Sequence, residues 1–429
     1  WGGYWGWDPV ENVALLPWLM ITAFVHSVIV QERRGMLKVW NMALVVAGYL
    51  LAVFATFTVR SGLIASVHSF ATSPIGGWFL GYLIIVVAVA IGFLIYRLPR
   101  LQSEHAIESV VSRESGFLLN NLLFTAIAFA TFWGTVFPLV TELFRSTKLT
   151  VGPPFYNQVN GPLLLALLIL MGIGPLLAWR RSSGRSLLRN LLWPGVAALV
   201  SLPIFYILVD NLLAAVSFAA VVLALGTTVL EYSRGARIRH KNTGEVYPKA
   251  LAMLVRKNSR RYGGYLVHIA VLIIAVGVIG SDFLQVEGQF TIGPRDTGQI
   301  GDVNNTFNGL DNRRTGEGQI VAAKLDIAKN GEPRSSIESL RFFYTNFESQ
   351  PTARMGIDTI GLDDIYVVLD QWETDQTASL RVYINPLVSW IWIGAVVYIL
   401  SMVTLLWPAP QPARKRVTKP VREVRLGEA

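Results

Sequence analysis

The first twelve residues of the chain combine aromatic and acidic side chains. Trp1, Trp5 and Trp7 are followed by Asp8 and Glu11, just ahead of a long apolar run. Indole rings stack on large flat ligands, whereas carboxylates at the edge of an apolar segment are costly without a function. The segment therefore predicts a binding site for a planar ligand. The simpler alternative is an aromatic belt at a membrane surface.

Histidine is the strongest nitrogen ligand for a metal in this chain, which has 5 histidines and no cysteine. His26 lies five residues before Gln31, and His268 lies five residues after Gly263. If these residues mark the ends of two membrane spans, both imidazoles sit about 7 Å inside the same boundary. Two histidines at one depth are typical of a pair of ligands. The alternative for each is a neutral histidine bonded to a neighbouring helix.

The other three histidines lie outside the apolar runs. His68 follows the second apolar run, on the same side as the tryptophans, and a loop histidine is by itself usually solvated. His105 and His240 lie in charged segments, so we expect both to be solvated surface residues.

The composition indicates a protein that crosses a membrane several times. Hydrophobic residues make up 52% of the chain, charged residues 15%, and the mean hydropathy is +0.46. A soluble protein could not bury so much apolar surface. Because a helical span needs about 20 apolar residues, the sequence predicts nine spans, at residues 11–30, 40–58, 77–96, 117–139, 161–179, 190–209, 211–231, 264–284 and 386–407.

Basic residues in the connections predict the orientation of these spans. The odd-numbered connections and the tail are rich in arginine and lysine and should be cytoplasmic, whereas the even-numbered ones should face outward. The weakest point is the pair of spans flanking Asp210, which could instead form one kinked element. The net charge of +9 comes from residues next to span ends, where anionic lipid head groups explain it, so nucleic acid is not an expected partner.

The predicted fold is an all-α polytopic membrane protein with a small β-rich extracytoplasmic domain inserted before the last helix. The outward segment contains short apolar runs at 286–292, 320–327 and 365–369, separated by turn residues. We expect a helical region, a β-rich domain, a last helix and a basic cytoplasmic tail. Their bounds are 1–284, with the tryptophan motif at 1–12 and an outer loop at 59–76, then 285–385, 386–407 and 408–429.

Several strings closely resemble one known family. The tryptophan motif, together with Pro17–Trp18–Leu19 and His26–Ser27, resembles the tryptophan-rich WWD haem-handling signature of the cytochrome c biogenesis superfamily, in its CcmF-type haem lyase branch. The resemblance covers essentially the whole chain, with further matching strings at 59–71, 112–121, 134–139, 151–157, 260–268 and 385–392. It implies a multi-pass protein of the bacterial inner membrane, with the tryptophan motif and the β-rich domain on the periplasmic face. It also implies that several spans preceding Trp1 are missing here.

The resemblance implies a haem lyase of cytochrome c maturation. Such a protein accepts haem from a holo haem chaperone and promotes thioether attachment to the Cys-x-x-Cys-His motif of apocytochrome c. It also implies a permanent b-type haem, held by His26 and His268, as electron donor, with quinol as a candidate source of electrons. Thiol-reducing and TPR maturation subunits that bind the apocytochrome are the other expected partners.

The resemblance also assigns roles to individual residues. His68 would hold the iron of the substrate haem above the tryptophan motif, opposite a histidine that precedes Trp1 in the family. The implied catalytic residues are His68, Trp1, Trp5, Trp7 and Asp8. Further implied haem-binding residues are His26, His268, Gly2, Gly3, Glu11 and Asn12. Asn120 and Asn121 enter the fourth span, where interhelical hydrogen bonding and haem contact are both open.

Two other classes of function stay open. The first is a haem transporter, in which the histidines mark successive positions along a path across the membrane. The second is a structural subunit that docks the haem chaperone and apocytochrome through the outer domain. Neither the client cytochrome nor a specialised Cys-x-x-Cys-Lys target follows from the sequence.

Overall fold

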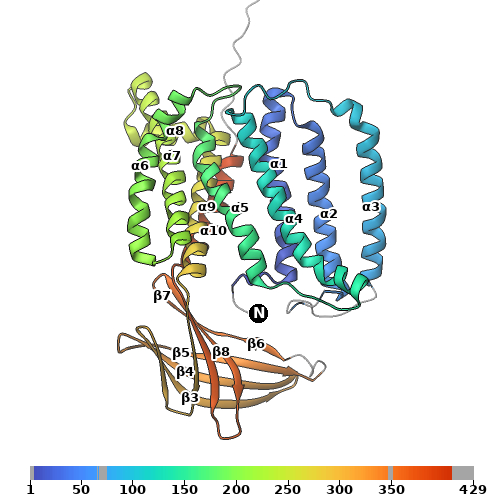
Figure 1. The fold of residues 1–429 in the computed structure, drawn as a ribbon. Helices are drawn as coiled ribbons and strands as arrows, with labels where there is room; N and C mark the ends of the chain where they lie inside the picture. The colour runs from blue at the N-terminus through green and yellow to red at the C-terminus, as the bar shows by residue number, and fades with distance from the viewer. Residues whose placement is uncertain (1–3, 65, 67–74, 346–350, 408–429) are drawn as a thin grey trace, which may run out of the picture.

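The computed structural model describes residues 4–64, 66, 75–345 and 351–407, and it consists of a bundle of long helices with a β-sandwich at one end (Figure 1). Its helices are α1 Pro9–Arg34, α2 Lys38–Ser61, α3 Ile75–Arg97, α4 Arg113–Arg145, α5 Pro153–Ile173, α6 Gly184–Val209, α7 Leu212–Thr243, α8 Tyr247–Lys257, α9 Ser259–Phe283 and α10 Ser389–Leu406. Two 3₁₀ turns lie at Leu98–Leu101 and Gly174–Leu176.

In the part of the chain that the structure describes, nine helices are long and apolar enough to cross a membrane. The predicted number of spans is therefore confirmed. Some helices run well past the predicted apolar windows, and α4 and α7 reach 33 and 32 residues. Polar residues such as Arg, Glu and Lys are good helix formers, so a helix continues beyond the apolar stretch that marks it in the sequence.

The segment around Asp210 forms a tight turn between two separate helices, α6 and α7. Asp210 ends α6 in the left-handed conformation, at φ 50°, and Asn211 caps α7 by accepting a hydrogen bond from the Ala214 amide at 3.0 Å. The two helices pack along each other. The alternative of one kinked element is therefore wrong.

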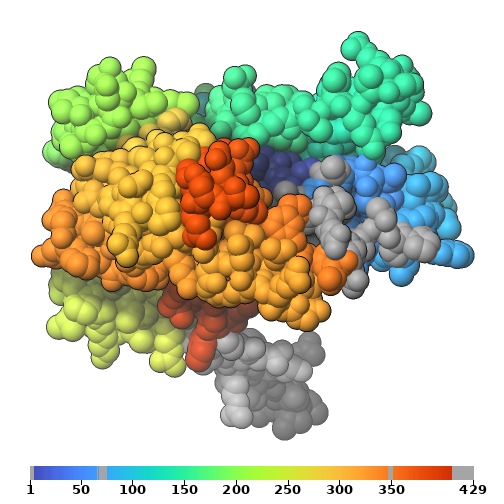
Figure 2. Space-filling model, turned by 90° about the horizontal axis from the view of Figure 1, so that it is seen from below, coloured from blue at the N-terminus to red at the C-terminus, as the bar shows by residue number. Residues whose placement is uncertain are grey.

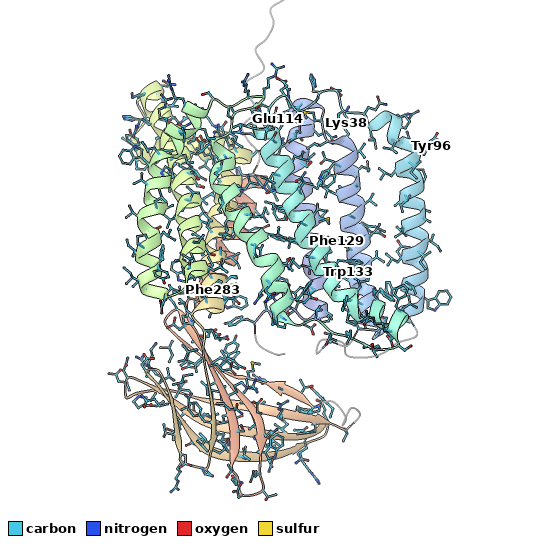
Figure 3. The ribbon with its side chains drawn as sticks, viewed as in Figure 1. Lys38, Tyr96, Glu114, Phe129, Trp133 and Phe283 are labelled. Carbon is cyan, nitrogen blue, oxygen red and sulfur yellow. The ribbon has the colours of Figure 1, made fainter. Side chains whose placement is uncertain are left out.

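Helix α8 was not among the predicted elements. Its apolar residues Ala250 and Leu254 are buried four positions apart, whereas Lys249, Arg256 and Lys257 lie around them. Such a short amphipathic helix escapes a search for 20-residue apolar windows. It lies at the end of the bundle farthest from the β-sandwich, where Lys38 and Glu114 also lie (Figure 3). We call this the basic end of the bundle.

The helices form two packed groups that α5 connects. In one group α1 packs against α2 and α4, and in the other α9 packs against α7, α8 and α10. Glycine allows the close approach of α9 and α10, since a Cβ at Gly394 in α10 would lie 2.9 Å from the Ile274 backbone nitrogen in α9. Helices α1 and α9 belong to different groups and are not closely packed partners.

The β-sandwich follows α9 in the chain and precedes α10. One antiparallel sheet has the order β1–β9–β8–β7 and the other β2–β3–β4–β5–β6. The core between them contains the fully buried Phe307, Leu325 and Val382. The strands are β1 Val286–Ile292, β2 Thr297–Ile300, β3 Val303–Thr315, β4 Gly318–Lys329, β5 Glu332–Tyr344, β6 Thr352–Arg354, β7 Gly356–Ile360, β8 Asp363–Trp372 and β9 Ala378–Asn385.

Short connections hold the sandwich against the ends of the helices. The Leu387 amide donates to the Asp363 carboxylate at 3.1 Å, and the Ser389 amide donates to the Leu362 carbonyl at 3.2 Å. Seen from the sandwich side, the start of the chain in dark blue is flanked by the sandwich and by the teal α4–α5 segment (Figure 2). The tryptophan motif therefore lies where three parts of the fold meet.

Candidate functional sites

The carboxylates of the tryptophan motif organise its backbone. Asp8 is the N-cap of α1 and accepts a hydrogen bond from the Val10 amide at 2.9 Å. The Glu11 carboxylate accepts from the amides of Asp8 and Gly6, at 3.1 and 2.9 Å. This is a capping box, which fixes how the chain enters the helix. Both carboxylates therefore position the residues that precede α1.

The Trp7 indole is held by α5. Its ring stacks on Tyr156 with centroids 5.0 Å apart and an interplanar angle of 8°, and its Nε1 donates to the Asn157 side chain at 2.7 Å. Trp5 meets Trp7 edge to face at 5.6 Å and is 48% exposed. The two indoles thus form an aromatic surface with one supported and one open ring. Tyr156 and Asn157 were not assigned to this site from the sequence.

Gly134 in α4 makes room for the Tyr156 ring, because a Cβ there would lie 2.8 Å from that ring. We expect Gly134→Ala to destabilise the protein by about 1–3 kcal/mol through overpacking. Gly161→Ala is the matched control, since a Cβ at Gly161 meets nothing within 4 Å. Thermal melting in detergent measures both, and equal melting temperatures would contradict this account of the Trp7 support.

Asn12 connects the motif to α4. It is fully buried, and its amide nitrogen donates to the Trp7 carbonyl at 3.0 Å and to the Thr135 hydroxyl at 3.1 Å. The Ser66 hydroxyl, from the loop after α2, donates to the Asp8 carboxylate. This bond places Ser66 beside the motif. Four predicted site residues, Trp1, Gly2, Gly3 and His68, lie outside the described residues.

Tyr4 links the motif to the β-sandwich. Its hydroxyl donates to the Asp364 carboxylate, and its ring stacks on Tyr366 with centroids 5.0 Å apart. Burial and the adjacent Asp364 raise the pKa of Tyr4 above the usual tyrosine value. This contact was not predicted, because it joins residues 360 positions apart.

Tyr4→Phe is expected to lower the free energy of unfolding by about 1–3 kcal/mol, because the buried Asp364 carboxylate loses a hydrogen-bond donor. The folded-state pKa of Tyr4 is raised. The stability that the Tyr4 hydroxyl contributes is therefore fully present below the ordinary tyrosine pKa of about 10, and it is lost as the pH rises through the raised value. Melting temperatures of wild type and Tyr4→Phe should thus differ at neutral pH and converge in strong alkali. Tyr344→Phe, whose exposed hydroxyl makes no hydrogen bond within the described chain, is the control. No difference at neutral pH would contradict the assigned contact.

The structure brings His26 and His268 together between the two helix groups. Their ring centroids are 6.1 Å apart with an interplanar angle of 17°. Phe117 and Phe124 of α4 lie 6.1 and 6.2 Å from the His26 ring, and Tyr265 lies 6.4 Å from the His268 ring. Two imidazoles from helices far apart in the sequence, α1 and α9, thus meet in an aromatic setting.

The geometry of this pair fits one shared metal. An imidazole nitrogen binds a metal at about 2 Å, and the ring centre lies about 1 Å behind it, so two ligating rings have centres about 6 Å apart. His26 Nδ1 lies 2.8 Å from the Thr22 carbonyl, an arrangement that leaves Nε2 with the free lone pair. His268 Nδ1 is buried and has no partner among the described residues. A polar atom left this way is costly unless something else binds it.

Three of the remaining residues singled out in the sequence have structural contacts, whereas the Asn120 amide nitrogen is buried without a partner among the described residues. His105 Nδ1 lies 2.9 Å from the Arg34 carbonyl. His240 packs on Tyr247 with ring centroids 4.6 Å apart and lies 2.7 Å from the Glu245 carbonyl, so it is half-buried rather than solvated. Asn121, with its amide turned to satisfy both ends, donates to the Ala23 carbonyl of α1 at 2.9 Å, an interhelical bond.

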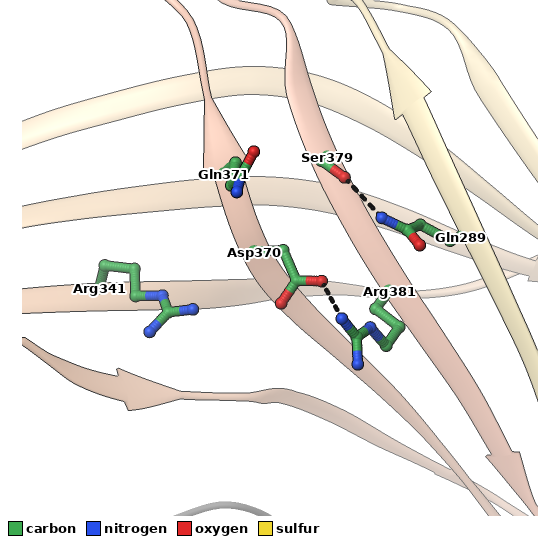
Figure 4. A pocket seen from close by; sticks show the side chains of 6 residues that line it. All are labelled: Gln289, Arg341, Asp370, Gln371, Ser379 and Arg381. Atoms are coloured by element: carbon green, nitrogen blue, oxygen red, sulfur yellow. Dashed lines mark hydrogen bonds and ion pairs between the residues drawn. The ribbon is translucent and has the colours of Figure 1, made fainter.

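A polar cavity of about 350 Å³ opens on the β-sandwich, lined by Gln289, Arg341, Asp370, Gln371, Ser379 and Arg381 (Figure 4). Arg381 pairs with Asp370 at 2.7 Å, and Gln289 donates to Ser379 at 3.2 Å. Arg341 Nε donates to the Leu369 carbonyl at 2.9 Å, and no aromatic residue lines the cavity. It does not have the character of a site for a planar ligand.

Comparisons with known proteins agree with both parts of the fold. The family described as "Cytochrome C assembly protein" matches residues 1–64, and "CcmF C-terminal beta-sandwich" matches residues 283–386. The chain is 32% identical over 406 residues to the cytochrome c-type biogenesis protein CcmF of Haemophilus influenzae, covering 92% of this chain and 60% of that protein. It is 33% identical to CycK of Bradyrhizobium diazoefficiens over 427 residues, covering 97% and 64%.

A solved structure named "Cytochrome c Heme Lyase CcmF" is similar over 95% of this chain and 61% of that one, with a TM-score of 0.72 and 29% identity. The chain spans about three fifths of the length of these relatives. The fold defines a multi-pass membrane protein with a β-sandwich at one end of its helices. Over more than 90% of its length the chain resembles the CcmF family of cytochrome c-type biogenesis proteins.

Proposed function

We propose that this chain forms part of a haem lyase of cytochrome c maturation. In this proposal His26 and His268 hold a permanent b-type haem, and the tryptophan motif with His68 positions a second, substrate haem. The observation that carries the proposal is the spacing of the two imidazole rings, 6.1 Å between centroids, in a chain that resembles this family.

The permanent haem would supply one-electron transfer, which keeps the iron of the substrate in the oxidation state that attachment needs. The protein's own contribution is to orient both imidazoles. The Thr22 carbonyl holds the His26 ring, and the packing of α9 against α10 holds the helix that carries His268. Quinol is a candidate source of electrons.

Attachment itself is an addition without net oxidation. Each thiol of the apocytochrome motif adds across one vinyl group, so that an S–C bond forms at the vinyl carbon next to the porphyrin ring while the S–H bond breaks. The hydrogen goes to the terminal vinyl carbon. The chain's role is proximity and orientation. Trp5 and Trp7 offer a surface for the porphyrin plane, and Asp8, Glu11 and Asn12 hold the backbone that carries them.

The proposal includes a location and a set of partners. The basic end of the bundle would face the cytoplasm, and the tryptophan motif and β-sandwich the periplasm of a bacterial inner membrane. A holo haem chaperone would deliver the substrate, and thiol-reducing and TPR maturation subunits would present the reduced apocytochrome c. The bond between Ser66 and Asp8 supports this arrangement because it joins a residue two positions before His68 in the chain to the motif.

The test is covalent attachment by the purified full-length protein. It is supplied with holo haem chaperone and a reduced apocytochrome c peptide, and haem that resists acid-acetone extraction is measured. The proposal predicts covalent haem on the peptide at a rate that depends on the protein. Haem transfer into liposomes without any attachment would instead favour a transporter. Binding of chaperone and peptide without either outcome would favour a docking subunit.

A further inference from the structure

We propose that Arg33, Arg113 and Arg261 form a binding site for the two propionate carboxylates of the haem held by the histidine pair. We call these three residues the arginine cradle. The inference rests on the proposed function and extends it, because it assigns the polar edge of that haem to the basic end of the bundle.

The spacing along two helices places the cradle in line with the histidines. Arg33 lies seven residues after His26 in α1, and Arg261 lies seven residues before His268 in α9. Seven residues make nearly two helical turns, so each arginine shares a face with its histidine, about 10 Å farther along the axis. Because α1 ends and α9 begins at the basic end, both arginines lie on the same side of the ring pair.

Aromatic contacts connect His26 to two of these arginines. The His26 ring lies 6.1 Å from Phe117, which lies 6.2 Å from Trp179. The guanidinium carbons of Arg33 and Arg113 lie 5.5 and 5.6 Å from the centre of the Trp179 ring. The cationic groups of α1 and α4 thus converge on one indole. This indole is linked to His26 through Phe117.

A second set of contacts leads from His268 to the third arginine. The His268 ring lies 6.4 Å from Tyr265, and the Arg261 guanidinium lies 5.9 Å from the same tyrosine ring. The charges of Arg33, Arg261 and Glu231 all act on Arg113, so these groups lie close enough to interact. The two sets of contacts therefore end in one electrostatic cluster.

The cluster carries a positive charge that nearby carboxylates do not neutralise. Glu231 pairs with Arg261 at 2.6 Å, and Glu114 pairs with Arg34 at 3.3 Å. Within the described residues, no carboxylate pairs with Arg33 or Arg113. Two unpaired guanidinium groups match a ligand with two carboxylates, and charge-assisted hydrogen bonds of this kind are among the strongest in proteins.

Arg113 is also held in place by backbone groups. Its Nε donates to the Leu177 carbonyl at 2.9 Å, and one terminal nitrogen donates to the Pro175 carbonyl at 2.8 Å. These bonds leave N–H groups on the terminal nitrogens for a ligand. They also mean that substituting Arg113 disturbs the 3₁₀ turn, so Arg33 is the cleaner residue to test.

The test compares two porphyrins on the full-length protein after its haem has been extracted. One is iron protoporphyrin IX, and the other is its dimethyl ester, which lacks both carboxylate charges. We expect Arg33→Gln to weaken binding of the free acid by about tenfold and to leave binding of the ester unchanged. Arg113→Gln should act in the same direction. Arg260→Gln, exposed and rotated off the face of His268, is the matched control and should change neither affinity.

The ratio of the two affinities is the informative quantity, because damage to the fold weakens both porphyrins alike. Equal ratios in wild type, Arg33→Gln and Arg260→Gln would overturn the arginine cradle. The proposed function fails differently. In that case His26→Ala and His268→Ala would still bind both porphyrins as tightly as wild type.

Discussion

Replacing Glu114 by alanine is expected to destabilise the protein by about 3 kcal/mol, the lower end of the cost of breaking a buried ion pair. The side chain is 3% exposed at the start of α4. Both of its oxygens accept from the Arg180 amide, at 3.1 and 3.0 Å, and one pairs with Arg34 at 3.3 Å. Its removal leaves the Arg180 amide without an acceptor and a largely buried guanidinium with one fewer partner. Arg34 keeps its bond to Glu108, which limits the cost.

Glu108→Ala is the matched control for Glu114→Ala. Glu108 pairs with Arg34 and Arg180, but its side chain is 47% exposed, so the loss should stay below about 1 kcal/mol. Denaturation in detergent gives both free energies of unfolding. Equal values for the two variants would contradict the idea that this carboxylate fastens the α5–α6 connection to α4.

The second large effect is expected from the histidine pair. His26→Ala or His268→Ala should lower the yield of covalent cytochrome c at least tenfold, because one ring alone cannot hold the permanent haem on both sides. The measurement is haem-stained cytochrome c from cells that depend on the full-length protein. His105→Ala and His240→Ala are controls, since neither ring contacts the pair within the described residues and each lies within hydrogen-bonding distance of a backbone carbonyl.

These variants also separate the candidate functions. Normal yields with both His26→Ala and His268→Ala would show that the pair is not needed for maturation and would leave a docking role. Loss in only one of them would contradict two equivalent ligands. Either interpretation requires equal protein levels in the membrane, measured by immunoblot for each variant and for wild type.

Much of the fold was predictable because membrane spans are a local property. Twenty apolar residues and a basic flank mark a helix without reference to any other part of the chain. The turn at Asp210–Asn211 needed the structure, because only packing shows that α6 and α7 are two helices. Strand β1 matched the predicted run 286–292, whereas the pairing of β1 with β9 depends on residues almost 100 positions apart.

The site was predictable to a similar extent. The matched depth of His26 and His268 along their spans predicted that the two rings form a pair. The same counting by helical turns places Arg33 and Arg261 in line with them. The support of Trp7 by Tyr156 was not predictable, because a tyrosine in a turn-like string has no periodic signature. The same holds for the Tyr4–Asp364 bond, which exists only once the β-sandwich sits against the helices.

The most direct test of the central claim is an electron paramagnetic resonance spectrum of the purified, oxidised full-length protein. Two imidazoles inclined by only 17° predict a rhombic low-spin ferric signal, and this signal should vanish in both His26→Ala and His268→Ala. A folded wild-type protein that is free of haem, or a low-spin signal that survives in either variant, would contradict a permanent haem between His26 and His268.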